Sequence, residues 1–499
     1  MAVAGCTPTS RTGDRPEWLT RCHVDGFDVE TLCGTLTVPE DPSNPDSSRS
    51  LELRVVVVPA VRPVPDPDPL VLLAGGPGQA ATEAYGPLMR ALSRIQQRRD
   101  LVMMDQRGTG ASAPLDCPSV GEDTLAERFA VDVPMDEITD CRDALTEGGA
   151  TLSHYTTASH TADLEALRTA LGVTSWNLYG GSYGTRAALD YAETHPERVR
   201  RLILDGVAPR QMPLFGTFAE DGQAALDALV AACAADVSGD PDKPGCAEAF
   251  PELSERLDRF LAADDHPLDL IHPRTGAPEA VGLPGSVRAA ALRNILYSPH
   301  IAALVPQAVY SATPPLPAAD ASTESPPPAG DLQPFIALAG AVGGDALSDS
   351  MSLGLMLSVA CSEDVHRIED AHVERSRDAF LGDQLIDVAR QWCAEWPVEP
   401  VLQSPVSGVS WDGPVLLMSG QLDPVTPPRW AETAAETLPD HAHIIVPGGG
   451  HIVAASGCVP EKMAEFLTAE ASVATMLDVS CAENTVRPPF ALDFAGPRG

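Results

Sequence analysis

Residues 176–193 read WNLYGGSYGTRAALDYAE, and this stretch decides the fold of the chain. The apolar run 176–179 is typical of a buried strand, and residues 185–193 have the composition of a helix. Between them stands Gly180-Gly181-Ser182-Tyr183-Gly184, a G-x-S-x-G pattern whose tight turn lifts a serine hydroxyl above the end of a strand. Side chains at the glycine positions would clash in such a turn. We therefore predict that Ser182 is a nucleophile.

A serine hydroxyl needs a base, and the base needs a carboxylate that fixes its tautomer and stabilises its charged form. After this turn the expected chain order is serine, then an acid, then a histidine. Predicted strand 415–419 runs into a turn that contains Asp423, and predicted strand 443–446 runs into a glycine-rich turn that ends at His451. Both residues follow strand ends, as Ser182 does. We predict that His451 is the general base and that Asp423 orients it. A turn aspartate and an exposed loop histidine are the alternatives.

An oxyanion formed in acyl transfer requires N–H donors that are already in place. The backbone N–H that follows the nucleophile, here Tyr183, is one expected donor. The loop 74–79 after predicted strand 70–73 reads AGGPGQ, and its paired glycines allow a close approach of the backbone to a substrate. We predict that Gly76 is the second donor and that Gly75 contacts the substrate; a plain turn is the alternative.

Apolar, β-branched runs recur along the chain, and each is followed by a helix-like stretch. This alternation indicates a parallel sheet with crossover helices. Two earlier runs, joined by the turn-rich DPSNPDSS at residues 41–48, indicate a hairpin and thus an antiparallel start to a mixed sheet. The runs are 34–38 and 51–58 for the hairpin and 70–73, 101–105, 176–179, 202–205, 415–419 and 443–446 for the parallel part.

The alternation disappears between residues 205 and 415, where amphipathic patterns such as 220–235 and 286–296 predict helices. We expect an inserted helical domain. Segment 312–330 is too rich in Pro, Ser and Ala to pack, and we expect a flexible surface loop there. The predicted division of the chain is an N-terminal tether at 1–20, a first core part at 21–206, a helical cap domain at 207–410 and a second core part at 411–499.

Composition narrows the classes of function. The formal net charge of −37, from 70 acidic against 33 basic residues, argues against a nucleic-acid partner. The sequence contains no run of about 18 apolar residues, which is the pattern that would predict a membrane span. We find neither a GxGxxG fingerprint nor a histidine pair with zinc-ligand spacing, so we expect chemistry without metal or nucleotide cofactor. Nothing in the sequence fixes the oligomeric state.

The eleven cysteines indicate an oxidising compartment and therefore export. No couple has CxxC spacing, which argues against zinc. Ten cysteines allow many connectivities, and nearest-neighbour pairing is favoured only by short loop closure. The local couples are Cys22 with Cys33, Cys117 with Cys141, Cys233 with Cys246, Cys361 with Cys393, and Cys458 with Cys481.

The remaining cysteine lies in Val3-Ala4-Gly5-Cys6, which resembles the lipobox of bacterial lipoproteins. That resemblance implies a lipid anchor to a membrane through Cys6, with residues 7–16 as a tether. Only five residues precede Cys6, so the charged and apolar parts of a signal peptide are missing before it. Either the start has been assigned too late or the match is due to chance. We expect an exported lipoprotein.

Five motifs together resemble the α/β-hydrolase peptidases that include prolyl iminopeptidase and the secreted bacterial tripeptidyl aminopeptidases. The resemblance spans about residues 33–481 and implies an α/β-hydrolase fold with a large inserted helical cap. Prolyl iminopeptidases carry HGGPG, and here Ala74 replaces the histidine, which favours the tripeptidyl-aminopeptidase-like branch. Arg107 in the second motif is expected to brace loops rather than to catalyse. The motifs are GGPG at 75–78, DQRGTGAS at 105–112, GGSYGT at 180–185, GQLDPVTP at 420–427 and GGGH at 448–451.

The resemblance implies a serine exopeptidase that acts near the free N-termini of peptides through an acyl-enzyme. Such an enzyme needs an anion for the α-ammonium of its substrate. The family carries an acidic residue after a cysteine placed like Cys361, so we expect Glu363, and in second place Asp364, to bind it. A solvated acidic turn is the alternative. A carboxylesterase for small esters is the alternative function, because the same triad serves both reactions.

Overall fold

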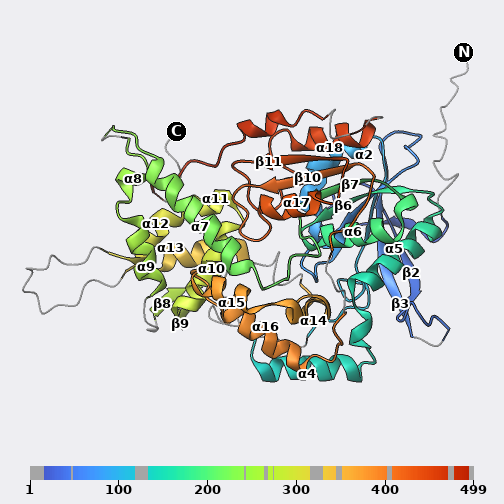
Figure 1. Cartoon of the computed structure of the whole chain (residues 1–499), viewed down its shortest axis with the longest axis horizontal. Coiled ribbons are helices and arrows are strands. Elements are labelled where there is room, and N and C mark those ends of the chain that lie inside the picture. Colours follow the sequence, from blue (N-terminus) through green and yellow to red (C-terminus); the bar gives the residue numbers. More distant parts are fainter. Residues whose placement is uncertain are drawn as a thin grey trace, which may run out of the picture.

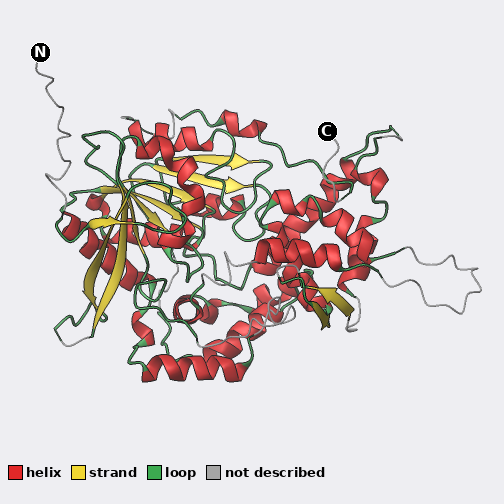
Figure 2. Cartoon of the chain, turned by 180° about the vertical axis from the view of Figure 1, so that it is seen from behind, coloured by secondary structure: helices red, strands yellow, loops and turns green. Residues whose placement is uncertain are grey.

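The chain combines a large twisted sheet, covered by helices on both faces, with a mainly helical insertion beside it (Figures 1 and 2). The computed structural model describes residues 16–46, 49–117, 133–240, 243–262, 268–272, 275–314, 330–343, 351–401, 407–469, 472 and 477–493. The Cys6 motif, the tether up to residue 15 and residues 315–329 of the predicted surface loop lie outside this part. Expectations about them stay predictions.

The nine-stranded sheet has the order β1-β2-β3-β5-β4-β6-β7-β10-β11. Strands β1, β2, β3 and β5 pair antiparallel, and the pairs from β5 through β4 to β11 are parallel. The predicted hairpin and parallel strands are thus confirmed, whereas the short edge strand β1 was not predicted. The strands are β1 Thr20–Cys22, β2 Thr31–Pro39, β3 Ser50–Val58, β4 Leu70–Leu73, β5 Leu101–Met104, β6 Trp176–Gly181, β7 Val199–Asp205, β10 Val415–Gly420 and β11 His441–Val446.

Two apolar cores flank the sheet because successive side chains of a strand point to opposite faces. In β4, Val71 and Leu73 belong to one core, while Leu70 and Leu72 belong to the other. Helices α5 (Thr157–Leu171), α6 (Tyr183–Thr194) and α17 (Pro428–Ala435) pack in the first core. Helices α2 (Met89–Gln96) and α18 (Val459–Thr468) pack in the second. This arrangement is the α/β-hydrolase architecture that the sequence predicts.

The insertion between β7 and β10 has its own apolar core. It is mainly helical, as predicted, and it also holds the antiparallel pair β8 (Leu268–Ile271) and β9 (Pro278–Val281), which was not predicted. Figure 1 shows α7 to α13 gathered on one side of the sheet. The exact domain limits stay a prediction.

The remaining helices are short or belong to the insertion. Before the insertion come α1 Ala81–Ala84 and α4 Met135–Glu147. Within it are α7 Phe218–Ala235, α8 Cys246–Ala249, α9 Leu253–Leu261, α10 Gly285–Leu296, α11 Pro299–Ala302, α12 Val305–Ala312, α13 Gln333–Gly343, α14 Leu353–Glu363, α15 Asp370–Arg377 and α16 Gln384–Glu395. The 3₁₀ turns are Gly86–Leu88, Leu152–His154, Pro196–Arg198, Val365–Arg367 and Ser480–Asn484. None of the helices in the described ranges is both long and apolar enough to cross a bilayer.

Arg107 braces the loops around β5, as expected. Its Nε and Nη2 atoms donate to the two carboxylate oxygens of Asp163 at 2.7 and 2.6 Å. Nη1 donates to the carbonyl oxygens of Glu40 and His154. The guanidinium is completely buried, so these bonds replace its hydration and tie three chain segments to α5.

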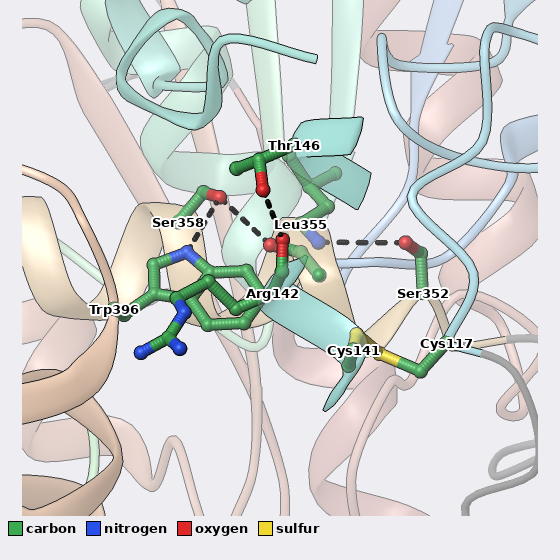
Figure 3. Close-up of a disulfide and its surroundings, with 9 residues drawn as sticks. Cys117, Cys141, Arg142, Thr146, Ser352, Leu355, Ser358 and Trp396 are labelled. Atoms are coloured by element: carbon green, nitrogen blue, oxygen red, sulfur yellow. Dashed lines mark hydrogen bonds between the residues drawn. A yellow bond between two sulfur atoms is a disulfide. The ribbon is translucent and has the colours of Figure 1, made fainter. Parts of the chain in front are cut away.

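The two cysteines of each predicted couple are joined by a disulfide, as nearest-neighbour pairing predicts. Cys117–Cys141 ties the segment after β5 to α4, beside the start of α14 (Figure 3). In the same region the Trp396 indole N–H donates to the Ser358 hydroxyl at 3.0 Å. Cys361–Cys393 joins α14 to α16. Cys361–Cys393 thus fastens two helices of the insertion, whereas Cys117–Cys141 fastens a segment of the core that precedes it.

We expect the native, unreduced chain to show at most one titratable thiol after denaturation, because ten of the eleven cysteines are bridged and only Cys6 remains. Loss of each bridge should lower the free energy of unfolding by about 2–5 kcal/mol. Thiol titration and urea unfolding with and without reductant measure both effects. The Cys6→Ser variant is the control and should show no thiol. Ten free thiols in native protein would contradict the pairing.

Candidate active site

Ser182 lies at the sharp turn from β6 into α6. Its φ of 56° and ψ of −124° are unusual for a residue with a side chain, and such strain costs about 1–3 kcal/mol. A Cβ on Gly184 would lie 2.1 Å from the Leu73 carbonyl oxygen, and one on Gly180 would lie 2.3 Å from that of Gly184. The Ser182 N–H also donates to the Asp205 carbonyl at 2.8 Å. Backbone contact therefore enforces the strained turn and requires glycine around the serine.

Asp423 and His451 form a hydrogen-bonded pair at the sheet edge. His451 Nδ1 lies 2.8 Å from Asp423 Oδ2. The carboxylate is buried and also accepts bonds from the Val425 and Thr426 amides and from the Thr426 hydroxyl. Burial raises the pKa of Asp423, but the charge of His451 and these bonds outweigh it, and the pKa lies below its ordinary value. Asp423 is thus held as an anion against the ring.

The surroundings of His451 favour its protonated form. Burial lowers the pKa of His451, but the charge of and hydrogen bond to Asp423 outweigh it, so this pKa lies above 6.5. The His451 amide donates to the Tyr297 carbonyl at 3.1 Å, and the two rings meet edge to face at 5.1 Å. The Thr426 hydroxyl lies 3.1 Å from Nδ1. The ring is therefore oriented by contacts on more than one side.

A pocket of about 1100 Å³ brings most of the predicted site residues together. Ser182, Tyr183, His451, Gly75 and Gly76 all line it, while Asp423 stands behind the histidine. Much of the remaining lining is apolar and comes from the insertion as well as from the sheet. These apolar residues include Met212, Leu214, Phe215, Phe218, Ile301, Met351, Met356 and Val425. Among the described residues of the lining, the charged side chains apart from the histidine are Glu83 and Arg293.

The glycine loop after β4 approaches the serine closely. A Cβ on Gly75 would lie 3.0 Å from the Ser182 Cβ, so a side chain there would be tightly crowded against the serine. Gly76 has a φ of 105°, which a side chain would disfavour. Tyr183 is the first residue of α6, where an N–H has no partner within the helix. Gly76 and Tyr183 thus both line the pocket that holds Ser182. Their role as oxyanion donors stays a prediction.

The structure does not bring Asp364 into this pocket. Its carboxylate is completely buried and pairs with Arg186 at 2.7 Å and with Arg367 at 2.6 Å. Arg186 projects from α6, nearly 180 positions earlier in the chain. The expectation that Asp364 binds a substrate ammonium is corrected, because these arginines already occupy the carboxylate.

Glu363 also lies outside the lining of this pocket and borders a separate small cavity with Arg186. Its two oxygens accept from the Thr157 amide at 2.7 Å and the Thr157 hydroxyl at 2.8 Å. That hydroxyl in turn lies 2.7 Å from the Tyr183 hydroxyl. Burial raises the pKa of Glu363 to about 7. Glu363 therefore supports the residue after the nucleophile from behind and does not face the pocket, contrary to the expectation of an ammonium-binding residue.

Asp205 is a residue of the site that sequence reasoning missed. It ends β7, and its buried carboxylate accepts from the Val453 and Ala454 amides at 2.9 and 2.8 Å and from the Tyr179 hydroxyl at 2.8 Å. Burial raises the pKa of Asp205 to about 6. The carboxylate thereby holds the loop that follows His451. An acidic residue that ends an apolar strand was the signal available in LILDG at residues 202–206.

Metal binding finds no support among the described residues, which contain no group of three or more His, Cys, Asp or Glu side chains able to hold an ion.

Comparison with known proteins agrees with this geometry. Residues 68–238 match the family described as alpha/beta hydrolase fold, and residues 378–481 match the family described as TAP-like protein. Serine protease Hip1 of Mycobacterium tuberculosis is 31% identical over 312 residues, which are 58% of this chain and 58% of that protein. Proline iminopeptidase of Xylella fastidiosa is 34% identical over 143 residues, 29% of this chain and 33% of that protein. The chain thus spans little more than half the length of its Hip1 relatives.

A solved proline iminopeptidase of Mycobacterium smegmatis has a TM-score of 0.38 at 16% identity, covering 87% of this chain and 96% of that one. The order of the sheet and the match of residues 68–238 identify the fold as that of an α/β-hydrolase. Residues 378–481 are similar to the TAP-like family, and the similar proteins include a serine protease and proline iminopeptidases, so the resemblance predicted from the motifs is confirmed.

We expect Ser182→Ala and His451→Ala each to lower kcat by about 10⁴- to 10⁶-fold with the fold unchanged, since triad members act as a unit. Hydrolysis of p-nitrophenyl butyrate and labelling by a fluorophosphonate measure this effect. The controls are Ser93→Ala and His300→Ala, which alter exposed residues outside the pocket lining. Near-normal turnover by Ser182→Ala, or labelling that persists in it, would refute the assignment.

We also expect kcat/KM to fall as the pH is lowered through a pKa above 6.5, because the base must be neutral and Asp423 raises the pKa of His451. A profile of kcat/KM between about pH 5 and 8 tests this range. Circular dichroism at each pH is the control for folding. A flat profile, or an inflection well below 6.5, would contradict the electrostatic description of His451.

Proposed function

We propose that this chain is an exported serine exopeptidase that hydrolyses peptide bonds near free N-termini. The observation that carries the proposal is the pocket that holds Ser182 and His451 together, with Asp423 hydrogen-bonded behind the histidine. The printed names of its relatives, serine protease and proline iminopeptidase, support a peptide substrate.

The proposed reaction proceeds through an acyl-enzyme. His451 takes the proton of the Ser182 hydroxyl as its oxygen attacks the scissile carbonyl, and Asp423 stabilises the imidazolium. The N–H groups of Tyr183 and Gly76 hold the negative oxygen. His451 then gives the proton to the departing amine, and the acyl-enzyme forms. A water molecule, activated by the same histidine, releases the acyl part and restores the serine.

Glu83 is our proposal for the group that binds the substrate α-ammonium. It is the acidic residue in the pocket lining, at the end of the glycine loop in α1. Glu83 is exposed, but partial desolvation and the negative charge of Asp105 raise its pKa above the ordinary value, against the opposing charge of Arg54. A nearby cation favours the charged form of a carboxyl group. The ammonium of a substrate would therefore be stabilised beside Glu83.

Export is supported by the five disulfides, which persist in oxidising compartments. A lipid anchor at Cys6 and the division into a core of 21–206 and 411–499 with a cap of 207–410 belong to the proposal. In this division the core supplies the triad, and the cap supplies part of the wall that selects the substrate.

A carboxylesterase for small esters is the second candidate, and one observation favours it. The apolar side chains that line the pocket, among them Phe215, Phe218 and Met351, suit an acyl chain as well as an apolar peptide. Esters and peptides therefore have to be compared directly.

We expect a tripeptidyl p-nitroanilide with a free N-terminus to be hydrolysed at least about tenfold more efficiently than its N-acetylated form. In Glu83→Gln, kcat/KM for the free form should fall by about 10- to 100-fold, because a charge-assisted bond is lost. Hydrolysis of p-nitrophenyl butyrate should change by less than about threefold, since this ester has no ammonium.

Glu363→Gln is the matched control, because it makes the same chemical change outside the pocket lining. It should alter all three substrates in the same proportion through Thr157 and Tyr183. Hydrolysis of the ester without any hydrolysis of the anilides would overturn the peptidase proposal in favour of the esterase.

A further inference from the structure

Arg293 places a guanidinium at the wall of the catalytic pocket. It lies in the last turns of α10, and its central carbon lies 4.6 Å from the centre of the Phe218 ring and 5.4 Å from that of the Tyr297 ring. Both aromatic residues also line the pocket. The stacked rings hold the planar group, which also shares a side-chain hydrogen bond with Tyr297.

Two nitrogens of the Arg293 side chain have no acceptor among the described residues. Its Nε and Nη2 atoms are buried and make no hydrogen bond. Within the described part of the chain, no carboxylate forms an ion pair with it, although the whole sequence has 70 acidic against 33 basic residues. A buried N–H donor without an acceptor costs free energy, so a bound anion that accepts its hydrogen bond would be stabilised.

Arg429 shows what a stacked arginine does elsewhere in this protein. Its guanidinium also lies over an aromatic ring, that of Trp430, at 4.6 Å. Unlike Arg293, it donates to Asp221 at 2.7 Å and to Glu220 at 3.3 Å. Stacking in this chain is thus compatible with a carboxylate partner on the guanidinium edge. Arg293 also stacks on aromatic rings, but among the described residues it has no carboxylate partner.

The position of Arg293 is on the histidine side of the pocket. Tyr297, on which it stacks, packs edge to face against the His451 ring. The charge of Arg293 also acts to lower the pKa of His451, against the stronger effect of Asp423. In the proposed reaction the leaving group departs where His451 hands over its proton. An anion bound by Arg293 would therefore belong to the leaving group.

We propose that Arg293 binds a carboxylate of the substrate and makes the enzyme selective for leaving groups that carry one. The planar fork of arginine matches a carboxylate with two parallel hydrogen bonds, and the apolar walls of the pocket strengthen that contact. The carboxylate is either an acidic side chain or the free C-terminus of a short peptide. The proposal deepens the proposed function and rests on it for the peptide substrates, but not for esters.

The ester arm of the test uses 4-carboxyphenyl butyrate and its methyl ester, which differ in the charge of the leaving group. We expect the ratio of their kcat/KM values to fall by about 10- to 100-fold in Arg293→Met relative to the wild type. The value for the methyl ester should stay within about threefold. Comparing ratios removes the difference in intrinsic reactivity between the two esters.

Two further variants separate recognition from structure. Arg90→Met removes an exposed charge outside the pocket lining and should leave the ratio unchanged. Arg293→Lys keeps the charge without the fork, so its ratio should lie between those of the wild type and Arg293→Met, and it serves if Arg293→Met fails to fold. A wild-type ratio retained in Arg293→Lys and Arg293→Met, or equal losses on both esters, would overturn the proposal.

The peptide arm distinguishes the two sources of the carboxylate. One pair of tetrapeptides has a free or an amidated C-terminus, and a second, amidated pair has Glu or Gln as its last residue. Arg293→Met should abolish the preference within one pair. If the wild type hydrolyses the esters but no peptide, the exopeptidase proposal fails, and the ester ratio still decides the role of Arg293.

Discussion

The contact between the turn at Gly180–Gly184 and the end of β4 is the constraint on which the rest of the site depends. The backbone of Gly184 lies so close to the Leu73 carbonyl that no side chain fits between them. This contact leaves Ser182 in a strained conformation above the sheet and beside Gly75. The nucleophile and the glycine loop are thus positioned by one packing event rather than by two separate ones.

The end of β7 connects this turn to the base. The Asp205 carbonyl accepts from the Ser182 amide, while the Asp205 carboxylate accepts from the amides that follow His451. One residue therefore fixes the spacing between the serine turn and the histidine loop. The cost of burying a carboxylate is offset by its bonds to two amides and the Tyr179 hydroxyl.

The sequence predicted the parts of the structure that depend on local signals. Apolar runs predict the central strands, and strand-end motifs single out Ser182, Asp423 and His451, because parallel strands bring their carboxyl ends to one edge. The partners of Glu363 and Asp364 were beyond such reasoning. Thr157 and Arg186 come from α5 and α6, and only the tertiary fold brings them to the end of α14.

Similar limits apply to the insertion. The pair β8–β9 consists of four-residue strands, too short for a clear alternation of apolar and polar residues. The role of Arg293 depends on two aromatic neighbours and on the absence of an acceptor at two of its nitrogens, which no periodicity encodes. The disulfides were predictable because each closes a short loop.

The join between the insertion and the glycine loop is made of main-chain atoms. The Ser352 amide donates to the Gly78 carbonyl at 2.9 Å, and Gln79 and Met351 form an isolated antiparallel bridge. Such bonds restrict the path of the backbone but not the identity of the side chains it carries. Met351 is an exception, because its sulfur would lie 3.1 Å from a Cβ on Gly76. At the other wall positions of the insertion, substitutions can accumulate without disturbing the loop beside the serine, so selectivity and chemistry are free to evolve at different rates.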